Sequence, residues 1–214
     1  MNESLLSAIT TVAPSWPLIL IVSLGKVIAS GRLWEEFLIL DLVVTLSLII
    51  LIYGRIVSRL VPGIASGSWT ILKENWLNYV IAIAIIGAPQ VALRIWIVGQ
   101  LGTPLWYVLS AIMISALFGV LTIYALPIVF LRKSSLAAIL AGVAYLFRNL
   151  AASYGMAAIV VLTHVLAAVG AVIFRMETAP WSFVLVLVLA VVTTFLTFVV
   201  FAAALGVLLG NAEQ

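Results

Sequence analysis

The sequence predicts an all-α, polytopic membrane protein, built as a single bundle of about six transmembrane helices with interfacial amphipathic helices on the cytoplasmic side. Two features of composition predict this fold class. Of the 214 residues, 66% are hydrophobic and 8% are charged, whereas a soluble domain carries about a quarter charged residues. The mean hydropathy is +1.36. This composition excludes a water-soluble monomer, and we expect residues 1–214 to form one transmembrane domain.

Long apolar runs are the third observation, because a helix needs about 20 mostly apolar residues to cross a hydrocarbon core ~30 Å thick. The first run, 17–30, is short and contains Lys26. Extended backwards through Pro14 to Leu5, it would form a kinked or tilted span. No run alternates polar and apolar residues, which excludes transmembrane β-strands. Five more spans are predicted at 37–53, 76–93, 105–131, 151–174 and 183–209.

Segments between the spans predict helices that lie on the membrane plane. Residues 63–78 place Trp69 and other apolar residues at helical spacing, opposite a face that carries Lys73. Residues 134–149 resemble them with a thinner polar face, and residues 4–12 are a poorer third candidate. An apolar stripe opposite a charged face is typical of an interfacial amphipathic helix.

A weak internal repeat connects these segments. Residues 69–75 align with residues 143–149, and a two-span hairpin follows each copy. The repeat predicts a unit of one surface helix followed by a transmembrane hairpin, used about three times. The units would be residues 1–61, 62–132 and 133–210.

The tryptophans support these boundaries, because an indole ring prefers the headgroup level of a bilayer. Each of the 7 tryptophans falls at or beside an end of a predicted span, and none falls in the middle of one. They are Trp16, Trp34, Trp69, Trp76, Trp96, Trp106 and Trp181.

Basic residues predict the orientation, since Lys and Arg in short loops favour the cytoplasmic side. Six of them lie in the two loops that carry the amphipathic segments, which places these loops and both termini in the cytoplasm, at the plasma membrane. If the first span is absent, only the N-terminus changes side. Isolated basic residues beside apolar runs suit anionic lipid headgroups better than nucleic acid. The candidate headgroup contacts are Arg55, Arg59, Lys73, Arg132, Lys133 and Arg148.

His164, the only histidine, falls near the centre of the fifth span. An ionisable group at that depth is a functional candidate, for instance in a proton relay. The alternative is a neutral imidazole bonded to a neighbouring helix, with Thr193, Thr194 or Thr197 of the last span as its partner. No further ligand lies nearby in sequence and the chain has no cysteine, so we expect neither a metal site nor a disulfide.

Gly87, Ala88, Pro89 and Gln90 interrupt the third span about halfway along. Proline frees a backbone carbonyl, and broken helices of this kind line binding sites in transporters. The alternative is a packing kink whose free carbonyl is satisfied by a neighbouring helix.

Two other features favour structural roles. Lys26 and Asp41 belong to one hairpin and are expected to pair or to anchor it at the outer side. Ala111, Ser115 and Gly119 recur at every fourth residue, a spacing that lets helix backbones approach closely.

No enzyme motif is present in the sequence. It has no phosphate-binding glycine loop, no His-Glu-x-x-His and no acidic cluster for Mg²⁺. The 7 acidic residues are divided between the two membrane faces, which disfavours a two-carboxylate or two-metal site. We therefore expect neither catalysis nor a cofactor.

Three short motifs resemble a known group of membrane proteins: Trp69-x-x-Leu72-Lys73-x-Asn75, Tyr124-Ala125-Leu126-Pro127, and residues 137–149 leading into a hairpin. The group comprises uncharacterised bacterial and archaeal proteins related to the membrane domain of glycerophosphodiester phosphodiesterases. The resemblance covers roughly residues 63–209. In that family the catalytic work belongs to a separate soluble domain, so the resemblance implies no catalytic residue here.

Two functional hypotheses follow. The first is a non-enzymatic membrane scaffold, accessory subunit or lipid-contacting module, whose partners are the lipid bilayer and a membrane protein or further copies of this chain. Repeated interfacial helices and few intramembrane charges favour it. The second is a small transporter or channel, favoured by His164, the predicted helix break at Pro89 with Gln90, and the repeat.

Overall fold

The computed structural model describes residues 2–30, 38–64, 67–98, 104–176 and 180–210. Every regular element in these ranges is a helix, which confirms the all-α prediction. Among them, five stretches are long and apolar enough to cross a membrane, and one bent helix pair would make a sixth. The helices are α1 Asn2–Val12, α2 Trp16–Ser30, α3 Leu38–Leu60, α4 Ser68–Val98, α5 Pro104–Leu121, α6 Ala125–Arg132, α7 Leu136–Arg148, α8 Leu150–Met176 and α9 Pro180–Gly210, with a 3₁₀ turn, η1 Ala13–Ser15, between the first two.

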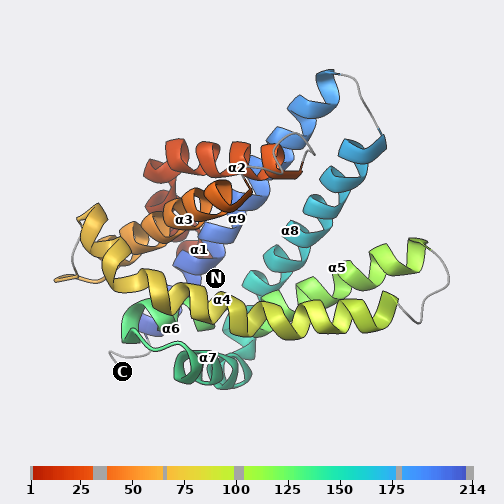
Figure 1. The fold of residues 1–214 in the computed structure, drawn as a ribbon. Helices are drawn as coiled ribbons and strands as arrows, with labels where there is room; N and C mark the ends of the chain where they lie inside the picture. Colours follow the sequence, from red (N-terminus) through yellow and green to blue (C-terminus); the bar gives the residue numbers. More distant parts are fainter. Residues whose placement is uncertain (1, 31–37, 65–66, 99–103, 177–179, 211–214) are drawn as a thin grey trace.

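The last helix, α9, is the centre of the bundle. It contacts α1, α2, α3, α6 and α8, and Figure 1 shows it running beside α8 along the length of the molecule. A second hairpin, α4 with α5, joins the bundle at the end where α5 meets α8 and diverges from α8 and α9 towards its far end (Figure 1). This divergence positions the candidate site described below.

Five aromatic side chains form the core where α3, α4, α6 and α9 meet. Tyr53 is the hub, with ring centroids 4.2 Å from Phe201, 4.9 Å from Phe198, 5.6 Å from Phe130 and 6.0 Å from Tyr79. All five rings are at most 4% exposed. Tilted and edge-on ring pairs at such distances add stabilisation beyond their buried area. The core therefore ties the first hairpin and α4 to the last helix.

The N-terminal helices form one apolar stretch, Leu5–Ile28. The structure thus adopts the extended form of the first span, with η1 at Pro14 joining α1 to α2. Ala8 and Val12 are buried, because α1 packs on α9. The prediction of a separate surface helix over residues 4–12 is therefore wrong, since its apolar face has a partner within the bundle.

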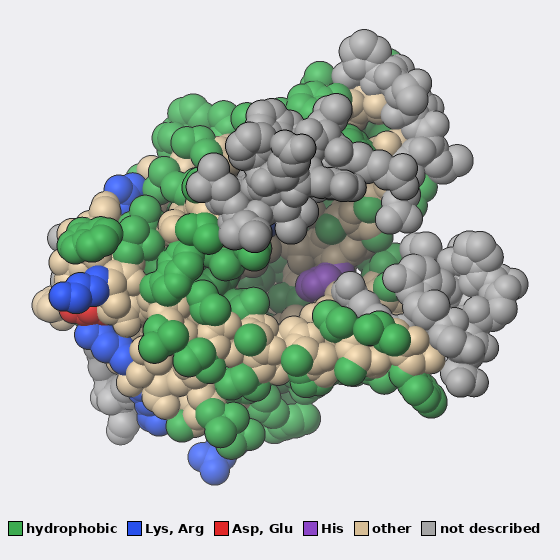
Figure 2. Space-filling model, viewed as in Figure 1, with side chains coloured by type: hydrophobic (Ala, Val, Ile, Leu, Met, Phe, Trp, Pro, Cys, Tyr) green, Lys and Arg blue, Asp and Glu red, His purple; other side chains and the backbone are tan. Residues whose placement is uncertain are grey.

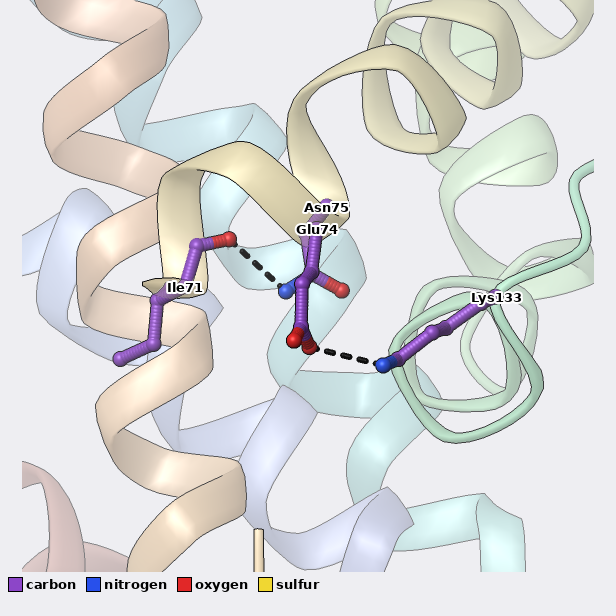
Figure 3. A network of polar contacts seen from close by, with 4 residues as sticks. All are labelled: Ile71, Glu74, Asn75 and Lys133. Atoms are coloured by element: carbon purple, nitrogen blue, oxygen red, sulfur yellow. Dashed lines mark hydrogen bonds and ion pairs between the residues drawn. The ribbon is translucent and has the colours of Figure 1, made fainter. Parts of the chain in front are cut away.

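The predicted surface helix over residues 63–78 is also wrong. Helix α4 begins at Ser68 and continues without interruption to Val98. The Asn75 side-chain amide donates to the Ile71 carbonyl 2.9 Å away, within the same helix (Figure 3). This amide bonds a carbonyl of its own helix and does not cap a second helix. The amphipathic turns therefore continue directly into the apolar turns of α4.

A break does occur in the predicted span 105–131, which is a correction of the sequence-based boundary. α5 and α6 differ in direction by 42° across the turn at residues 122–124. Pro127 lacks an N–H, so the Ile123 carbonyl loses its ladder bond. In the turn, the Ala125 N–H donates to the Thr122 carbonyl at 3.0 Å, an i→i−3 bond.

The break is stabilised by the close approach of α7. A Cβ atom on Gly142 would lie 2.6 Å from the Ala125 nitrogen and 3.0 Å from the Tyr124 carbonyl carbon. Only glycine permits this distance between the two backbones. The Tyr124 hydroxyl also lies 2.9 Å from the Ser153 hydroxyl of α8, within hydrogen-bonding distance.

The surface helix predicted over residues 134–149 is present as the separate helix α7. Lys133 precedes it in the left-handed region, at φ 51°, and ends α6. Asn149 alone separates α7 from α8, with φ −124° and ψ 38°. α7 is a 13-residue apolar helix, shorter than a span. The proposed repeat units stay a prediction.

The tryptophan pattern holds in part. Trp69, Trp96 and Trp181 are exposed and lie within two residues of a helix end. Trp16 and Trp76 instead fall inside the Leu5–Ile28 stretch and α4. Helical residues precede both, so these two tryptophans do not mark the ends of apolar helical stretches. Trp34 and the side chain of Trp106 lie outside the described residues.

Candidate functional site

The structure distributes the predicted site residues over two hollows and a basic end. His164 and Thr197 line one hollow, the recess, whereas Thr193 lines another, the groove. Pro89 and Gln90 lie on α4 and are not among the described residues that line either one. These hollows are therefore considered separately.

The predicted helix break at Pro89 is wrong. α4 continues through Pro89, with nine residues of helix after it. Pro89 is exposed, so its ring needs no space in a packed core, and the loss of one ladder bond leaves the 31-residue helix intact. The broken helix lies instead between α5 and α6, where Thr122 follows the last residue of α5.

The recess has a volume of about 160 Å³ and lies where α5, α8, α9 and α3 approach one another. Figure 2 shows the corresponding hollow in the surface, with histidine at its floor. Its wall includes Thr122 and Ile123, which belong to the turn between α5 and α6. The helix break therefore forms part of the recess. Its polar lining consists of Tyr53, Thr122, Thr163, His164 and Thr197.

His164 binds to its own helix and not to the threonines of α9, which is a correction of the predicted partner. Its Nδ1 lies 2.8 Å from the Val160 carbonyl oxygen. A carbonyl oxygen can only accept, so Nδ1 is the donor in this bond, and in the tautomer that carries its proton on Nδ1 the Nε2 atom presents a lone pair. A Cβ on Gly119 would lie 3.0 Å from Cε1 and 3.6 Å from Nε2. The Nε2 edge of the ring therefore faces α5.

The three threonine hydroxyls of the recess all use their protons inside their own helices. Thr122 Oγ1 donates to the Phe118 carbonyl at 2.7 Å. Thr163 Oγ1 donates to the Val160 carbonyl at 2.7 Å, and Thr197 Oγ1 donates to the Thr193 carbonyl at 2.8 Å. Each hydroxyl oxygen keeps lone pairs available as an acceptor. Sequence reasoning missed Thr122 and Thr163, although for Thr122 its place five residues before Pro127 was a usable signal.

Gly119 explains why the recess is small. A Cβ atom there would lie 2.8 Å from Val160 Cγ1. Without that methyl group, α5 and α8 approach closely at the level of His164. Of the small residues predicted to allow close helix packing, Gly119 therefore packs against another helix of the same chain.

The groove lies between α2, α8 and α9 and has a volume of about 840 Å³. Lys26 Nζ donates to Thr194 Oγ1 at 3.2 Å, while Ser23 Oγ bonds both Ile19 O at 2.7 Å and Ala190 O at 3.3 Å. The bonds to Thr194 and Ala190 join α2 to α9. The predicted pairing of Lys26 with Asp41 lies outside the described side chains.

The six predicted headgroup contacts gather at one end of the bundle. They come from the end of α3, the start of α4, the end of α6 and the end of α7, and Figure 2 shows most of the blue surface at this end. We call this surface the basic end. Its members are Arg55, Arg59, Lys73, Arg132, Lys133 and Arg148, and all except Arg55 are exposed.

Polar contacts fix part of the basic end. Lys133 Nζ lies 2.7 Å from Glu74 Oε2 (Figure 3), linking the residue after α6 to the first turns of α4. Arg59 donates from Nη1 to the Thr11 carbonyl at 2.7 Å, linking α3 to α1. The Lys133–Glu74 pair is exposed on both sides and contributes less than about 1 kcal/mol. The pair therefore connects Lys133, after α6, to the start of α4 but adds little to the stability of the fold.

No cluster of three or more metal-ligating side chains occurs within the described ranges. Comparisons with protein-family models, with curated proteins and with solved structures found no match. The resemblance to the membrane domain of glycerophosphodiester phosphodiesterases stays a prediction.

Proposed function

We propose that the protein is a non-enzymatic, multi-pass component of the plasma membrane whose basic end contacts anionic lipid headgroups. The observation that carries the proposal is that six basic side chains from four helices lie at one end, beside long apolar helices. Each Lys or Arg near an anionic leaflet gains about 1 kcal/mol of attraction. By the same charge rule, this end and both termini face the cytoplasm.

The position of α7 supports this proposal. Leu136, Leu140 and Phe147 are each about 60% exposed, whereas Leu146 on the same helix is buried. The helix ends at Arg148 and is too short to span a bilayer. A short helix that turns large apolar side chains outward beside basic residues suits the boundary between headgroups and acyl chains.

In this function the protein acts as a scaffold or accessory subunit. It positions a membrane-protein partner, or further copies of itself, against anionic lipid. Apolar helices separate the basic residues, and the hollow that Lys133 lines also contains the acidic Glu74, which disfavours nucleic acid as the partner.

Lipid retention tests the proposal. The protein is purified in mild detergent with equal amounts of phosphatidylglycerol and phosphatidylcholine, and the lipids retained are measured by mass spectrometry. We expect the wild-type protein to retain more phosphatidylglycerol than phosphatidylcholine. In the double variant Arg132→Gln/Arg148→Gln, this ratio should fall roughly fivefold for each charge removed, since each charge contributes about 1 kcal/mol. The matched control, Arg94→Gln, lies near the other end of α4 and should retain the enrichment. If the wild type, the double variant and Arg94→Gln all retain phosphatidylglycerol to the same extent, the proposal is refuted.

A small transporter or channel is the second candidate function. The observation that favours it is the recess at His164, because it combines a broken helix, at Thr122, with an ionisable side chain. Discontinuous helices whose free backbone groups line a cavity are the usual basis of binding sites in transporters.

Flux into proteoliposomes tests this second candidate. His164→Ala should abolish flux of the transported species, whereas Pro89→Ala should not, because α4 is continuous at Pro89 and its ring is exposed. Wild-type flux no greater than that of empty liposomes would eliminate a transport function for the species tested.

A further inference from the structure

We infer that the recess at His164 is a binding site for ammonium and small primary ammonium ions. These ions donate hydrogen bonds and accept none. This inference rests on the second candidate function and names its ligand class. It begins with the hydrogen-bond directions of the described residues that line the recess. Besides the Tyr53 hydroxyl, which can donate or accept, three threonine hydroxyls and one imidazole contribute to that polar lining.

The donors of these four groups are already used. Thr122, Thr163 and Thr197 donate their protons to main-chain carbonyls of their own helices. His164 donates from Nδ1 to the Val160 carbonyl. Each group therefore offers the recess only an acceptor: a hydroxyl oxygen or the Nε2 lone pair. The four acceptors equal in number the four N–H groups of ammonium.

The volume of the recess restricts the ligand to a small one. About 160 Å³ corresponds to roughly five water molecules at ~30 Å³ each. A nucleotide is larger than this space. Ammonium or methylammonium fits with one or two waters, and its donors pair with acceptors that would otherwise remain unsatisfied in a membrane interior.

The chemistry of the lining distinguishes ammonium from metal cations. Calcium and magnesium prefer carboxylate and carbonyl oxygens, and none of the described lining residues carries a carboxylate. An imidazole nitrogen suits zinc or copper, but the described residues contain no cluster of metal ligands. A nitrogen acceptor beside hydroxyl oxygens instead matches an N–H donor.

The single histidine makes the inference directly measurable. Protein labelled with ¹⁵N-histidine and purified without a histidine tag gives one imidazole spin system, in which Nδ1 and Nε2 have separate signals. Without ligand, we expect the tautomer that carries its proton on Nδ1, because the bond to the Val160 carbonyl needs a donor there. Ammonium chloride should shift the Nε2 signal saturably, whereas potassium chloride at the same ionic strength should not.

A matched pair of variants localises the binding. Thr197→Val removes an acceptor of the recess, and the loss of about 1–1.5 kcal/mol for one hydrogen bond should weaken ammonium binding roughly five- to tenfold. Thr193→Val changes the same residue type on the same helix, but Thr193 lines the groove and bonds the Ala190 carbonyl, so it should bind like wild type. An unchanged Nδ1 signal shows that each variant is folded.

Three results would overturn the inference: no saturable shift with ammonium, the same shift with potassium, or equal weakening by both variants. The flux assay separates this inference from the function on which it rests. Saturable binding without methylammonium flux means that the site is correct and transport is not. Flux with no change at Nε2 means that transport is correct and this site is not.

Discussion

The contact between Gly142 and the turn after α5 leads to the most sharply defined prediction. In Gly142→Ala, the new methyl group would lie 2.6 Å from the Ala125 nitrogen and 2.7 Å from its Cα. Ordinary contact begins at 3.4 Å, so α7 and α6 must separate by about 0.8 Å. The atoms in the way are main-chain atoms, which cannot rotate aside as a side chain can.

Overpacking of this kind costs about 1–3 kcal/mol, and a rigid obstacle favours the upper part of the range. The better helix propensity of alanine offsets up to about 1 kcal/mol. We therefore expect Gly142→Ala to lower the free energy of unfolding by about 2 kcal/mol. Reversible unfolding in mixed micelles with increasing dodecyl sulfate, followed by tryptophan fluorescence, measures the change.

Gly206→Ala is the matched control, because Gly206 is also helical and no atom lies within 4 Å of the position of its Cβ. It should leave stability unchanged or raise it by up to about 1 kcal/mol, the propensity gain alone. If Gly142→Ala unfolds at the same dodecyl sulfate fraction as Gly206→Ala, then the two helices are not packed as closely as the structure requires.

Three more predictions concern polar contacts and topology. Tyr124→Phe should lower the unfolding free energy by about 1 kcal/mol in the same assay, because it removes the buried bond to Ser153; no change would mean that the bond does not form. Lys133→Gln should cost less than about 1 kcal/mol, because its pair with Glu74 is exposed, and a larger loss would refute an exposed pair. Cysteines introduced at Lys133 and Arg148 in this cysteine-free chain should react with a membrane-impermeant maleimide from the same side of the membrane; labelling from opposite sides would disprove a common basic end.

The fold class and the long helices could be predicted from the sequence, because they depend on local apolar content. The runs of residues 151–174 and 183–209 correspond to α8, Leu150–Met176, and α9, Pro180–Gly210. The separate helix α7 could be predicted as well, from the amphipathic pattern of residues 134–149. In the structure, Lys133 in the left-handed conformation and the turn at Asn149 bound this helix.

The helix breaks could not be predicted, because they depend on tertiary contacts. Pro89 and Pro127 look alike in sequence, yet only the second lies beside a bend. What distinguishes them is a neighbour: α7 packs against the turn before Pro127 through Gly142, whereas Pro89 is exposed. Whether the chain bends therefore depends on which helix approaches, and local sequence does not record that.

The candidate site was predictable in one respect and not in another. The polarity of His164 at the centre of an apolar run identified a side chain that lines the recess, but its partner is the Val160 carbonyl of its own helix. Thr122 and Thr197 reach the same recess from residues 75 positions apart in the chain. The bond between Lys26 and Thr194 spans 168 positions. Contacts over such separations follow from the packing of the whole bundle.

The central place of α9 has a consequence for biogenesis. Helices α1 and α2 pack on α9, which the ribosome makes after α1 to α8. Until α9 is made, α1 and α2 lie in the translocon or the lipid, and Lys26 lacks Thr194, the residue of α9 that accepts its hydrogen bond. Nascent chains that stop before α9 should thus leave that segment exposed to quality-control proteases, and synthesis of α9 would be the step that completes the packing of α1 and α2.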